Sequence, residues 1–218
     1  MNGRPRALLF DLDGTLLDTG PDLARALNRL RVEDGLEPLP YGTIRPWVSH
    51  GSHALMRLGY AYEPGSADYE SRRQRLLDLY HSDVAAESRL FEGMDAVLAH
   101  AEAAGIPWGI VTNKPGWLTT PLLAALDLAG RAACVISGDT TARAKPHPDP
   151  LLAASAAIMR APVECLYVGD AERDVTAATA AGMPVLVALY GYLGPHDEPD
   201  TWGACGSIDR PLDLLGWL

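Results

Sequence analysis

Four aspartates follow two apolar segments of the sequence, at positions where their carboxylates could act together. Asp11 and Asp13 come directly after the apolar run 7–10, and their two-residue spacing puts both side chains on one side of an extended chain. Asp170 follows a second apolar run, and Asp174 comes four residues later, in the first turn of an expected helix. Carboxylates held close together repel, so such a group is stable when it binds a cation or when one member is protonated. Since Mg²⁺ prefers oxygen ligands, we expect Asp11, Asp13, Asp170 and Asp174 to form a magnesium site.

Taken one at a time, these aspartates also have plain structural interpretations. Asp13 before Gly14 is a common turn pair, and Asp170 or Asp174 could cap a helix. All of them together, at the ends of separate apolar runs, favour the metal site.

A second set of residues has the chemistry of phosphate ligands. Thr112 offers a hydroxyl, and the backbone N–H groups of Gly14 and Asn113 open turns that could donate to a phosphoryl group. Of the 18 basic residues only Lys114 and Lys145 are lysine, so these two positions are expected to need an amine. We expect the Lys145 ammonium to offset the carboxylates and to hold a phosphate oxygen.

The elements that must position these residues alternate along the chain. Short apolar runs predict strands, and the Ala- and Leu-rich segments between them have helical spacing, which together indicate a parallel sheet covered by helices on both faces. The expected strands are 7–10, 108–111, 134–136, 165–168 and 185–189, and the expected helices between them are 94–104, 117–126, 150–160 and 172–181. Ligands of open parallel sheets bind beyond the carboxyl ends of the strands, where the aspartates, Thr112 and Asn113 lie.

The interval from 19 to 90 contains no convincing strand and predicts a helical insertion. Its expected helices are 22–34, 52–58 and 69–86. We therefore divide the chain into a core of residues 1–17 and 91–218 and a helical cap of residues 18–90. The turn-rich tail 194–206 is expected to wrap the surface.

Composition excludes several classes of protein. The 18 basic and 28 acidic residues give a net charge of -10, which disfavours nucleic acid as a partner. No apolar run approaches the roughly 18 residues of a membrane span, so we expect no membrane partner and a cytoplasmic location. The three cysteines are far apart and are expected to be reduced.

The ordered motifs resemble those of the haloacid dehalogenase superfamily phosphatases. The resemblance rests on Asp11-Leu-Asp-Gly-Thr, Val111-Thr-Asn-Lys-Pro, Lys145-Pro-His-Pro, and Val168-Gly-Asp with Asp174, and it spans essentially the whole chain. It implies a Rossmann-like, doubly wound α/β core with an inserted helical cap of the phosphoglycolate phosphatase type.

The resemblance also implies a mechanism. Asp11 would form an aspartyl-phosphate, and Asp13 would protonate the leaving alkoxide and then accept a proton from water. The Asp11 carboxylate, the Asp13 carbonyl and Asp170 would bind Mg²⁺, with Asp174 in support. The phosphoryl oxygens would be positioned by Thr112, Asn113 and Lys145, and segment 14–19 would be a flap beneath the cap.

Other reactions of the superfamily fit less well. Dehalogenases lack an acid at the position of Asp13, and phosphonoacetaldehyde hydrolases use a cap lysine, whereas residues 19–90 contain none. A β-phosphoglucomutase-like mutase shares both aspartates and the cap type, and remains an alternative. A regulatory module that only binds a ligand would have no need of Asp13.

Two substrates of a phosphatase compete. The segments 19–24 and 138–140 resemble phosphoglycolate phosphatases, whereas Leu90-Phe-Glu-Gly-Met, Tyr190-Gly-Tyr and Trp202-Gly-Ala resemble the N-acetylmuramic acid 6-phosphate phosphatases of cell-wall recycling. The second set is less widely shared, and we favour that substrate. The expected partner is therefore a small phosphate ester, with the enzyme a monomer or homodimer.

Both substrates carry a carboxylate, so the cap is expected to supply a cation. The candidates for this contact are Arg45, His50, Gly51, Ser52 and His53. Arg45 could equally be a solvated surface residue, and the two histidines ordinary loop residues. The arginines 72, 73 and 75 are expected to form a solvated helix face.

Overall fold

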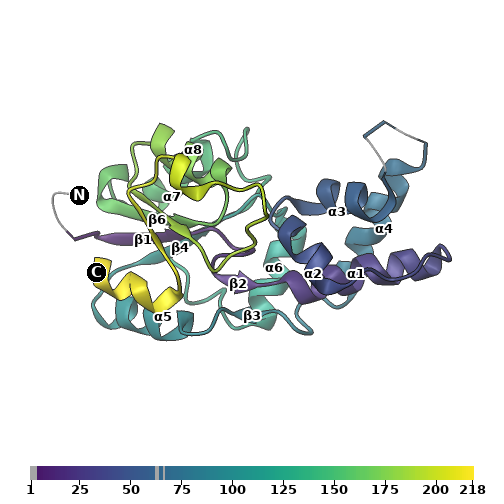
Figure 1. The fold of residues 1–218 in the computed structure, drawn as a ribbon. Helices are drawn as coiled ribbons and strands as arrows, with labels where there is room; N and C mark the ends of the chain where they lie inside the picture. The colour runs from purple at the N-terminus through teal and green to yellow at the C-terminus, as the bar shows by residue number, and fades with distance from the viewer. Residues whose placement is uncertain (1–3, 62–63, 66) are drawn as a thin grey trace.

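A six-stranded parallel sheet forms the centre of the computed structural model (Figure 1). The structure describes residues 4–61, 64–65 and 67–218, so residues 1–3 of the expected core and 62–63 and 66 of the expected cap lie outside the described residues. The spatial order of the strands is β5-β4-β1-β6-β7-β8. Their bounds are Ala7–Phe10 (β1), Trp108–Val111 (β4), Cys134–Ile136 (β5), Cys165–Gly169 (β6), Val185–Ala188 (β7) and Gly206–Ile208 (β8).

Helices cover both faces of the sheet. Successive side chains of each strand point to opposite faces, so an apolar strand presents apolar side chains to helices on both sides. From β1, Leu8 and Phe10 pack into one apolar cluster, whereas Ala7 and Leu9 pack into another. The first cluster includes α5 (Met94–Ala103) and α6 (Gly116–Ala125), and the second includes α7 (Asp149–Ala157) and α8 (Glu172–Ala180). Figure 1 shows α7 and α8 on one side of the sheet and α5 on the other.

A helical segment extends from one end of the sheet (Figure 1). It contains α1 (Gly20–Glu33), α2 (Tyr41–Ile44), α3 (Gly51–Tyr60) and α4 (Tyr69–Ser82), with a 3-10 helix, η1, at Arg45–Trp47. The apolar face of α1, built on Leu23, Leu27 and Leu30, lies in the same cluster as Leu76 and Leu79 of α4. Both crossings between the segment and the core pass through a short antiparallel pair, β2 (Leu17–Asp18) with β3 (Arg89–Leu90).

The doubly wound α/β architecture predicted from the sequence is confirmed, and each of the five expected strands lies within one residue of its predicted bounds. The sequence missed β2, β3 and β8. The tail 194–206 leads into β8, which pairs with β7 at the edge of the sheet. Helix α4 also ends at Ser82, four residues before the expected end at Ala86. The division of the chain into core and cap remains a prediction.

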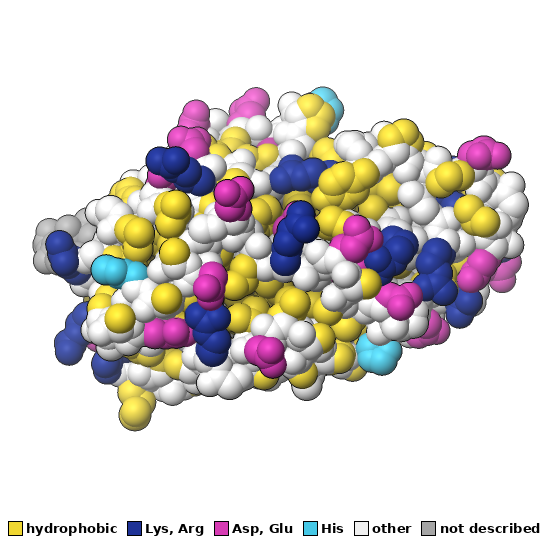
Figure 2. All heavy atoms as spheres, turned by 90° about the horizontal axis from the view of Figure 1, so that it is seen from below, with side chains coloured by type: hydrophobic (Ala, Val, Ile, Leu, Met, Phe, Trp, Pro, Cys, Tyr) yellow, Lys and Arg dark blue, Asp and Glu magenta, His cyan; other side chains and the backbone are white. Residues whose placement is uncertain are grey.

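Three further 3-10 helices complete the described chain: η2 (Pro162–Glu164), η3 (Pro199–Thr201) and η4 (Pro211–Trp217). None of the described helices has both the length and the apolar character needed to cross a bilayer. On the face shown in Figure 2, basic and acidic side chains of the described residues alternate. Many are paired, as Arg75 is with Glu33 and Arg29 with Asp83.

Candidate active site

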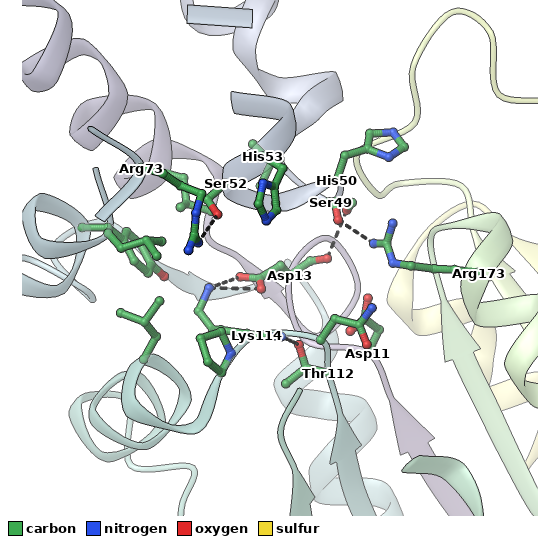
Figure 3. A pocket seen from close by; sticks show the side chains of 18 residues that line it. Asp11, Asp13, Ser49, His50, Ser52, His53, Arg73, Thr112, Lys114 and Arg173 are labelled. Carbon is green, nitrogen blue, oxygen red and sulfur yellow. Dashed lines mark hydrogen bonds and ion pairs between the residues drawn. The ribbon is translucent and has the colours of Figure 1, made fainter. Parts of the chain in front are cut away.

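The carboxyl ends of the three central strands meet at a cavity of about 360 Å³, which residues of both the core and the helical segment line (Figure 3). Asp11 follows β1, whose neighbours on either side are β4 and β6. Phe10 is in register with Ile110 and Val168, so Thr112 and Asp170 follow their strands one residue beyond the level of Asp11. The parallel sheet therefore brings together residues that are about 100 and 160 positions apart.

Lys145 is the centre of a buried ionic network. Its Nζ lies 2.9 Å from Asp11 Oδ1 and 2.7 Å from Asp174 Oδ1. It also donates to the Val111 carbonyl and to the Tyr167 hydroxyl, each at 2.8 Å. The ammonium therefore holds the carboxylates of Asp11 and Asp174 in place.

Burial and mutual repulsion shift the titration of these acids. Burial raises the pKa of Asp11 to about 6, against the opposing charge of Lys145. Burial and the Asp11 and Asp174 charges raise the pKa of Asp170 to about 7. Although burial opposes it, the charges of Lys145 and Arg173 lower the pKa of Asp174 below its usual range. A further positive charge between Asp11 and Asp170 would stabilise both as carboxylates.

The residues around these acids fit a divalent cation. One oxygen from each of Asp11, Asp170 and Asp174 lies within 4.8 Å of the others, and all three residues are buried. A Cβ on Gly14 would come within 2.1 Å of Asp170 Oδ2, and one on Gly191 within 2.3 Å of Asp170 Cβ, so two glycines make room for this carboxylate. Buried, closely spaced oxygen donors are the chemistry that Mg²⁺ prefers.

Two residues expected to hold phosphate make different contacts. The single N–H of Gly14 donates to the Leu17 carbonyl at 3.0 Å, so in this structure the glycine provides clearance for Asp170 instead. The Asn113 side chain donates to the Lys145 carbonyl at 2.9 Å and accepts from the Lys145 N–H at 3.0 Å. Asn113 therefore positions the backbone of the lysine. The buried Thr112 hydroxyl faces the cavity and accepts from the Lys114 N–H at 3.1 Å.

Asp13 lines the cavity beside Asp11 and has its own cation. Lys114 Nζ lies 2.9 and 3.1 Å from its two carboxylate oxygens, and the Thr19 hydroxyl donates to Oδ1 at 2.5 Å. Burial lowers the pKa of Lys114, but Asp13 and Tyr80 together outweigh it, and the pKa is raised above its usual value. Both lysines of the chain thus pair with aspartates of the site.

Ser49 reaches from the helical segment to the Asp170 carboxylate and to the backbone carbonyl of Asp13. Its hydroxyl lies 2.7 Å from Asp170 Oδ2 and 3.3 Å from the Asp13 carbonyl oxygen. The Ser49 carbonyl accepts from Arg173 Nη2 at 2.6 Å, which fastens the loop before α3 to the first turn of α8 (Figure 3). Ser49 begins the loop 49–53 that was expected to contact the substrate, but its contact with Asp170 and the contact of Arg173 were not predicted.

The motif Tyr190-Gly-Tyr192 contacts both Asp170 and the segment 15–20. The Tyr192 N–H donates to Asp170 Oδ2 at 2.9 Å, and its hydroxyl donates to Asp18 and accepts from the Gly20 N–H. The Tyr190 hydroxyl donates to the Thr15 carbonyl at 3.0 Å. This motif therefore connects an acid of the site to the segment that leads into the helices.

The structure separates the five cap candidates. His50, Gly51, Ser52 and His53 all line the cavity, with His53 Nδ1 2.5 Å from the Tyr69 hydroxyl. Figure 3 shows the His50 ring turned away from Asp11 and Asp13.

Arg45 is not among the residues that line the cavity. It donates to the Tyr190 carbonyl at 2.9 Å and lies 5.1 Å from the centre of the Tyr192 ring. Arg73, by contrast, lines the cavity from α4. The prediction of a solvated face was wrong for this arginine. Its position three and four residues before Leu76 and Leu77, at the edge of an apolar stripe, was the available signal.

Comparison with known proteins places this fold and site in one class. The chain belongs to the haloacid dehalogenase-like hydrolases, whose family model matches residues 8–188. The match includes Asp11, Asp13, Lys145, Asp170 and Asp174. Relatives within this class show that the chain is a phosphatase.

Two relatives carry different names for their activities. A phosphoglycolate phosphatase of Xanthomonas campestris is 43% identical over 96% of this chain and 95% of its own. An N-acetylmuramic acid 6-phosphate phosphatase of Pseudomonas putida is 39% identical over 97% of this chain and 95% of its own. A crystal structure of a predicted phosphoglycolate phosphatase from Haemophilus somnus superposes with a TM-score of 0.86 at 25% identity, over 99% of both chains.

Proposed function

We propose that this phosphatase is Mg²⁺-dependent, transfers phosphate through an aspartyl-phosphate on Asp11, and acts on a small phosphate ester that carries a carboxylate. N-acetylmuramic acid 6-phosphate is the favoured substrate, and a reaction in cell-wall recycling would take place in the cytoplasm. The observation that carries the proposal is the buried network in which Lys145 holds Asp11 and Asp174 beside Asp170, below a cavity that Asp13 lines.

The cation would be held by the Asp11 and Asp170 carboxylates and by the Asp13 carbonyl. When bound, Mg²⁺ supplies positive charge that stabilises the phosphoryl group during transfer. Asp174 would support this site from behind, because one of its oxygens accepts from Lys145 and Tyr167 and the other from the Ala171 N–H.

Asp11 and Asp13 would divide hydrolysis into two displacements. A carboxylate oxygen of Asp11 attacks phosphorus, the bond from phosphorus to the ester oxygen breaks, and protonated Asp13 gives its proton to the departing alkoxide. Asp13, now a carboxylate, accepts a proton from water as the water oxygen attacks the phosphorus, which releases inorganic phosphate and regenerates Asp11. Thr112 and Lys145 would hold phosphoryl oxygens, and Asn113 would position Lys145.

The size of the cavity supports a sugar phosphate. At about 360 Å³ it lies in the range that encloses drug-sized ligands, which exceeds what a two-carbon acid needs. The position of Lys114 favours 2-phosphoglycolate as the second candidate, because an ammonium 2.9 Å from Asp13 lies close to where the ester oxygen would leave. Relatives of both names support the two candidates.

Phosphate release tests the reaction. With Mg²⁺, the enzyme should release phosphate from N-acetylmuramic acid 6-phosphate with a higher kcat/KM than from 2-phosphoglycolate, and Asp11→Asn should abolish both. Poor, equal rates on the two esters would overturn the substrate ranking. Conversion of β-glucose 1-phosphate to the 6-phosphate without phosphate release would indicate a mutase.

A further inference from the structure

Three polar side chains at the cap side of the cavity have no part in phosphoryl transfer. Arg73 and Tyr80 belong to α4 and Lys114 to the loop after β4, and all three line the cavity. Arg73, Leu77 and Tyr80 are spaced by four and three residues, so one face of α4 presents them to the cavity with an apolar side chain between two polar ones. A ligand with an apolar body and a polar group would match this order.

The Tyr80 hydroxyl donates no hydrogen bond within the described part of the chain. Tyr80 is only 1% exposed, and the Lys114 ammonium beside its hydroxyl is itself a donor, so the hydroxyl proton has no acceptor there. Burial raises the pKa of Tyr80 to about 12, so the hydroxyl keeps its proton at neutral pH and can donate it. A buried hydroxyl without an acceptor is costly, and in a cavity wall a ligand atom can satisfy it.

Lys114 lies next to this hydroxyl, with its Nζ 4.6 Å from the centre of the Tyr80 ring. Its side chain is buried, and its charge is balanced by the Asp13 carboxylate. An ammonium and a hydroxyl that lie side by side in the cavity wall can together bind an anionic group on the leaving alcohol.

Arg73 supplies a second positive charge from the cap (Figure 3). Its Nε donates to Glu70 at 2.9 Å and its Nη1 lies 3.4 Å from the Ser52 hydroxyl, so the side chain is held at the wall. The guanidinium is thereby oriented before a ligand arrives, which reduces the entropy lost on binding.

We propose that Lys114, Tyr80 and Arg73 form a subsite for a carboxylate on the leaving alcohol. This inference rests on the proposed phosphatase function and deepens it by naming the residues that select the substrate. Lys114 and the Tyr80 hydroxyl contact the carboxylate, Arg73 adds charge from the cap, and Leu77 and Leu118 pack against the carbon body. These are specificity residues, because phosphoryl transfer itself takes place at Asp11 and Asp13.

Matched pairs of esters test the subsite. N-acetylmuramic acid 6-phosphate is compared with N-acetylglucosamine 6-phosphate, which lacks the lactyl carboxylate, and 2-phosphoglycolate with 2-hydroxyethyl phosphate. The readout is the ratio of kcat/KM for the acidic ester to that for its neutral partner. Tyr80→Phe and Arg73→Gln should each lower this ratio roughly tenfold in at least one pair, since each removes a hydrogen bond to a charged group.

Arg75→Gln is the control, because Arg75 lies on the same helix and pairs with Glu33 outside the cavity. It should leave the ratio at the wild-type value, while Thr112→Val should lower both members of a pair alike. Should Tyr80→Phe and Arg73→Gln keep the wild-type ratio in both pairs, or Arg75→Gln lower it equally, the subsite is overturned.

The two proposals fail in different ways. An enzyme that releases no phosphate from any of the four esters with Mg²⁺ contradicts the proposed function. An enzyme that hydrolyses both members of each pair with equal kcat/KM contradicts only the subsite. Tyr80→Phe keeps the ring and its packing, so the test remains decisive if Arg73→Gln does not fold.

Discussion

The two walls of the cavity differ in how their polar groups are satisfied. On the core wall, buried Lys145 is bonded to Asp11 and Asp174 at 2.9 and 2.7 Å, and Asp170 accepts from the Tyr192 N–H at 2.9 Å. On the cap wall, the Tyr80 hydroxyl proton has no acceptor among the described residues, and Arg73 is held at the edge of the wall by Glu70 and Ser52. The core wall is thus complete without substrate, whereas the cap wall presents donors to one.

This difference separates chemistry from selection. A network organised in advance can perform the same phosphoryl transfer on many esters, because it contacts only the group they share. Specificity then depends on the leaving alcohol, which the proposed subsite places against the cap wall, Lys114 and Leu118. Changes to the core wall should therefore affect all substrates, and changes to the cap wall should discriminate between them.

Replacement of Lys145, the positive charge at the centre of the buried network, should have the largest effect. Lys145→Met leaves Asp11 and Asp174 buried without their counter-ion, and we expect the free energy of unfolding to fall by about 3–5 kcal/mol, with activity lost on every ester. Urea unfolding and phosphate release measure the two effects. Arg29→Ala breaks a half-exposed pair with Asp83 and should cost at most about 1 kcal/mol. Equal costs for the two variants would contradict the role of Lys145 as the centre of a buried ionic network.

The metal-free protein should become less stable as pH rises from about 5 to 8. The pKa values of about 6 for Asp11 and about 7 for Asp170 lie above the ordinary 3.8, so the folded state binds protons that the unfolded state has already lost. Unfolding free energy should drop by a few kcal/mol over this window, on the order of 1.4 kcal/mol for each pKa unit. Asp174, whose pKa is lowered, acts in the opposite sense and only below about pH 4.

Added Mg²⁺ should remove most of that loss, because it stabilises both carboxylates in the folded state. Thermal unfolding across pH, with and without Mg²⁺, is the measurement. A metal-free protein that becomes more stable from pH 5 to 8 would contradict the placement of these acids.

Gly14→Ala should weaken the binding of Mg²⁺ and leave the rest of the fold unchanged. The new Cβ would meet Asp170 Oδ2 at 2.1 Å, and φ is +89° at this residue. We expect the Mg²⁺ concentration for half-maximal activity to rise roughly tenfold or more, as for other residues that orient metal ligands. Gly35→Ala has a similar φ of +74° but open space around the Cβ, and should leave the metal dependence unchanged.

Arg45→Gln should have the smallest effect and sharpens the contrast within the cap. Arg45 contacts Tyr190 and Tyr192, so its loss should cost about 1 kcal/mol of stability. The ratio of kcat/KM between acidic and neutral esters should stay within about twofold of wild type. A fall as large as that for Arg73→Gln would place the substrate's carboxylate at Arg45.

Most of the sheet could be predicted because its strands carry their signal locally. The run 7–10 is apolar throughout, as a strand buried on both faces requires, and its bounds are those of β1. In β8 only Ile208 is buried, so pairing with β7 rather than local sequence determines this strand. The β2–β3 pair joins segments about 70 residues apart, and no local pattern marks it.

The same distinction holds for the site. Asp11, Thr112 and Asp170 follow the carboxyl ends of strands that the sequence predicts to be parallel, so the sequence was enough to predict that they lie together. Arg73 and Arg75 are two residues apart on one helix, and their different directions depend on how α4 packs against α1. The contact of Ser49 with Asp170 depends on closure of the helical segment over the core, which no sequence pattern specifies.

Acid-quenched mass spectrometry of the working enzyme tests the central claim most directly. We expect the peptide containing Asp11 to carry a phosphoryl group while ester and Mg²⁺ are present, and to lose it once the ester is consumed. Steady release of phosphate with Asp11 never modified, or with the phosphoryl group on another residue, would contradict the account.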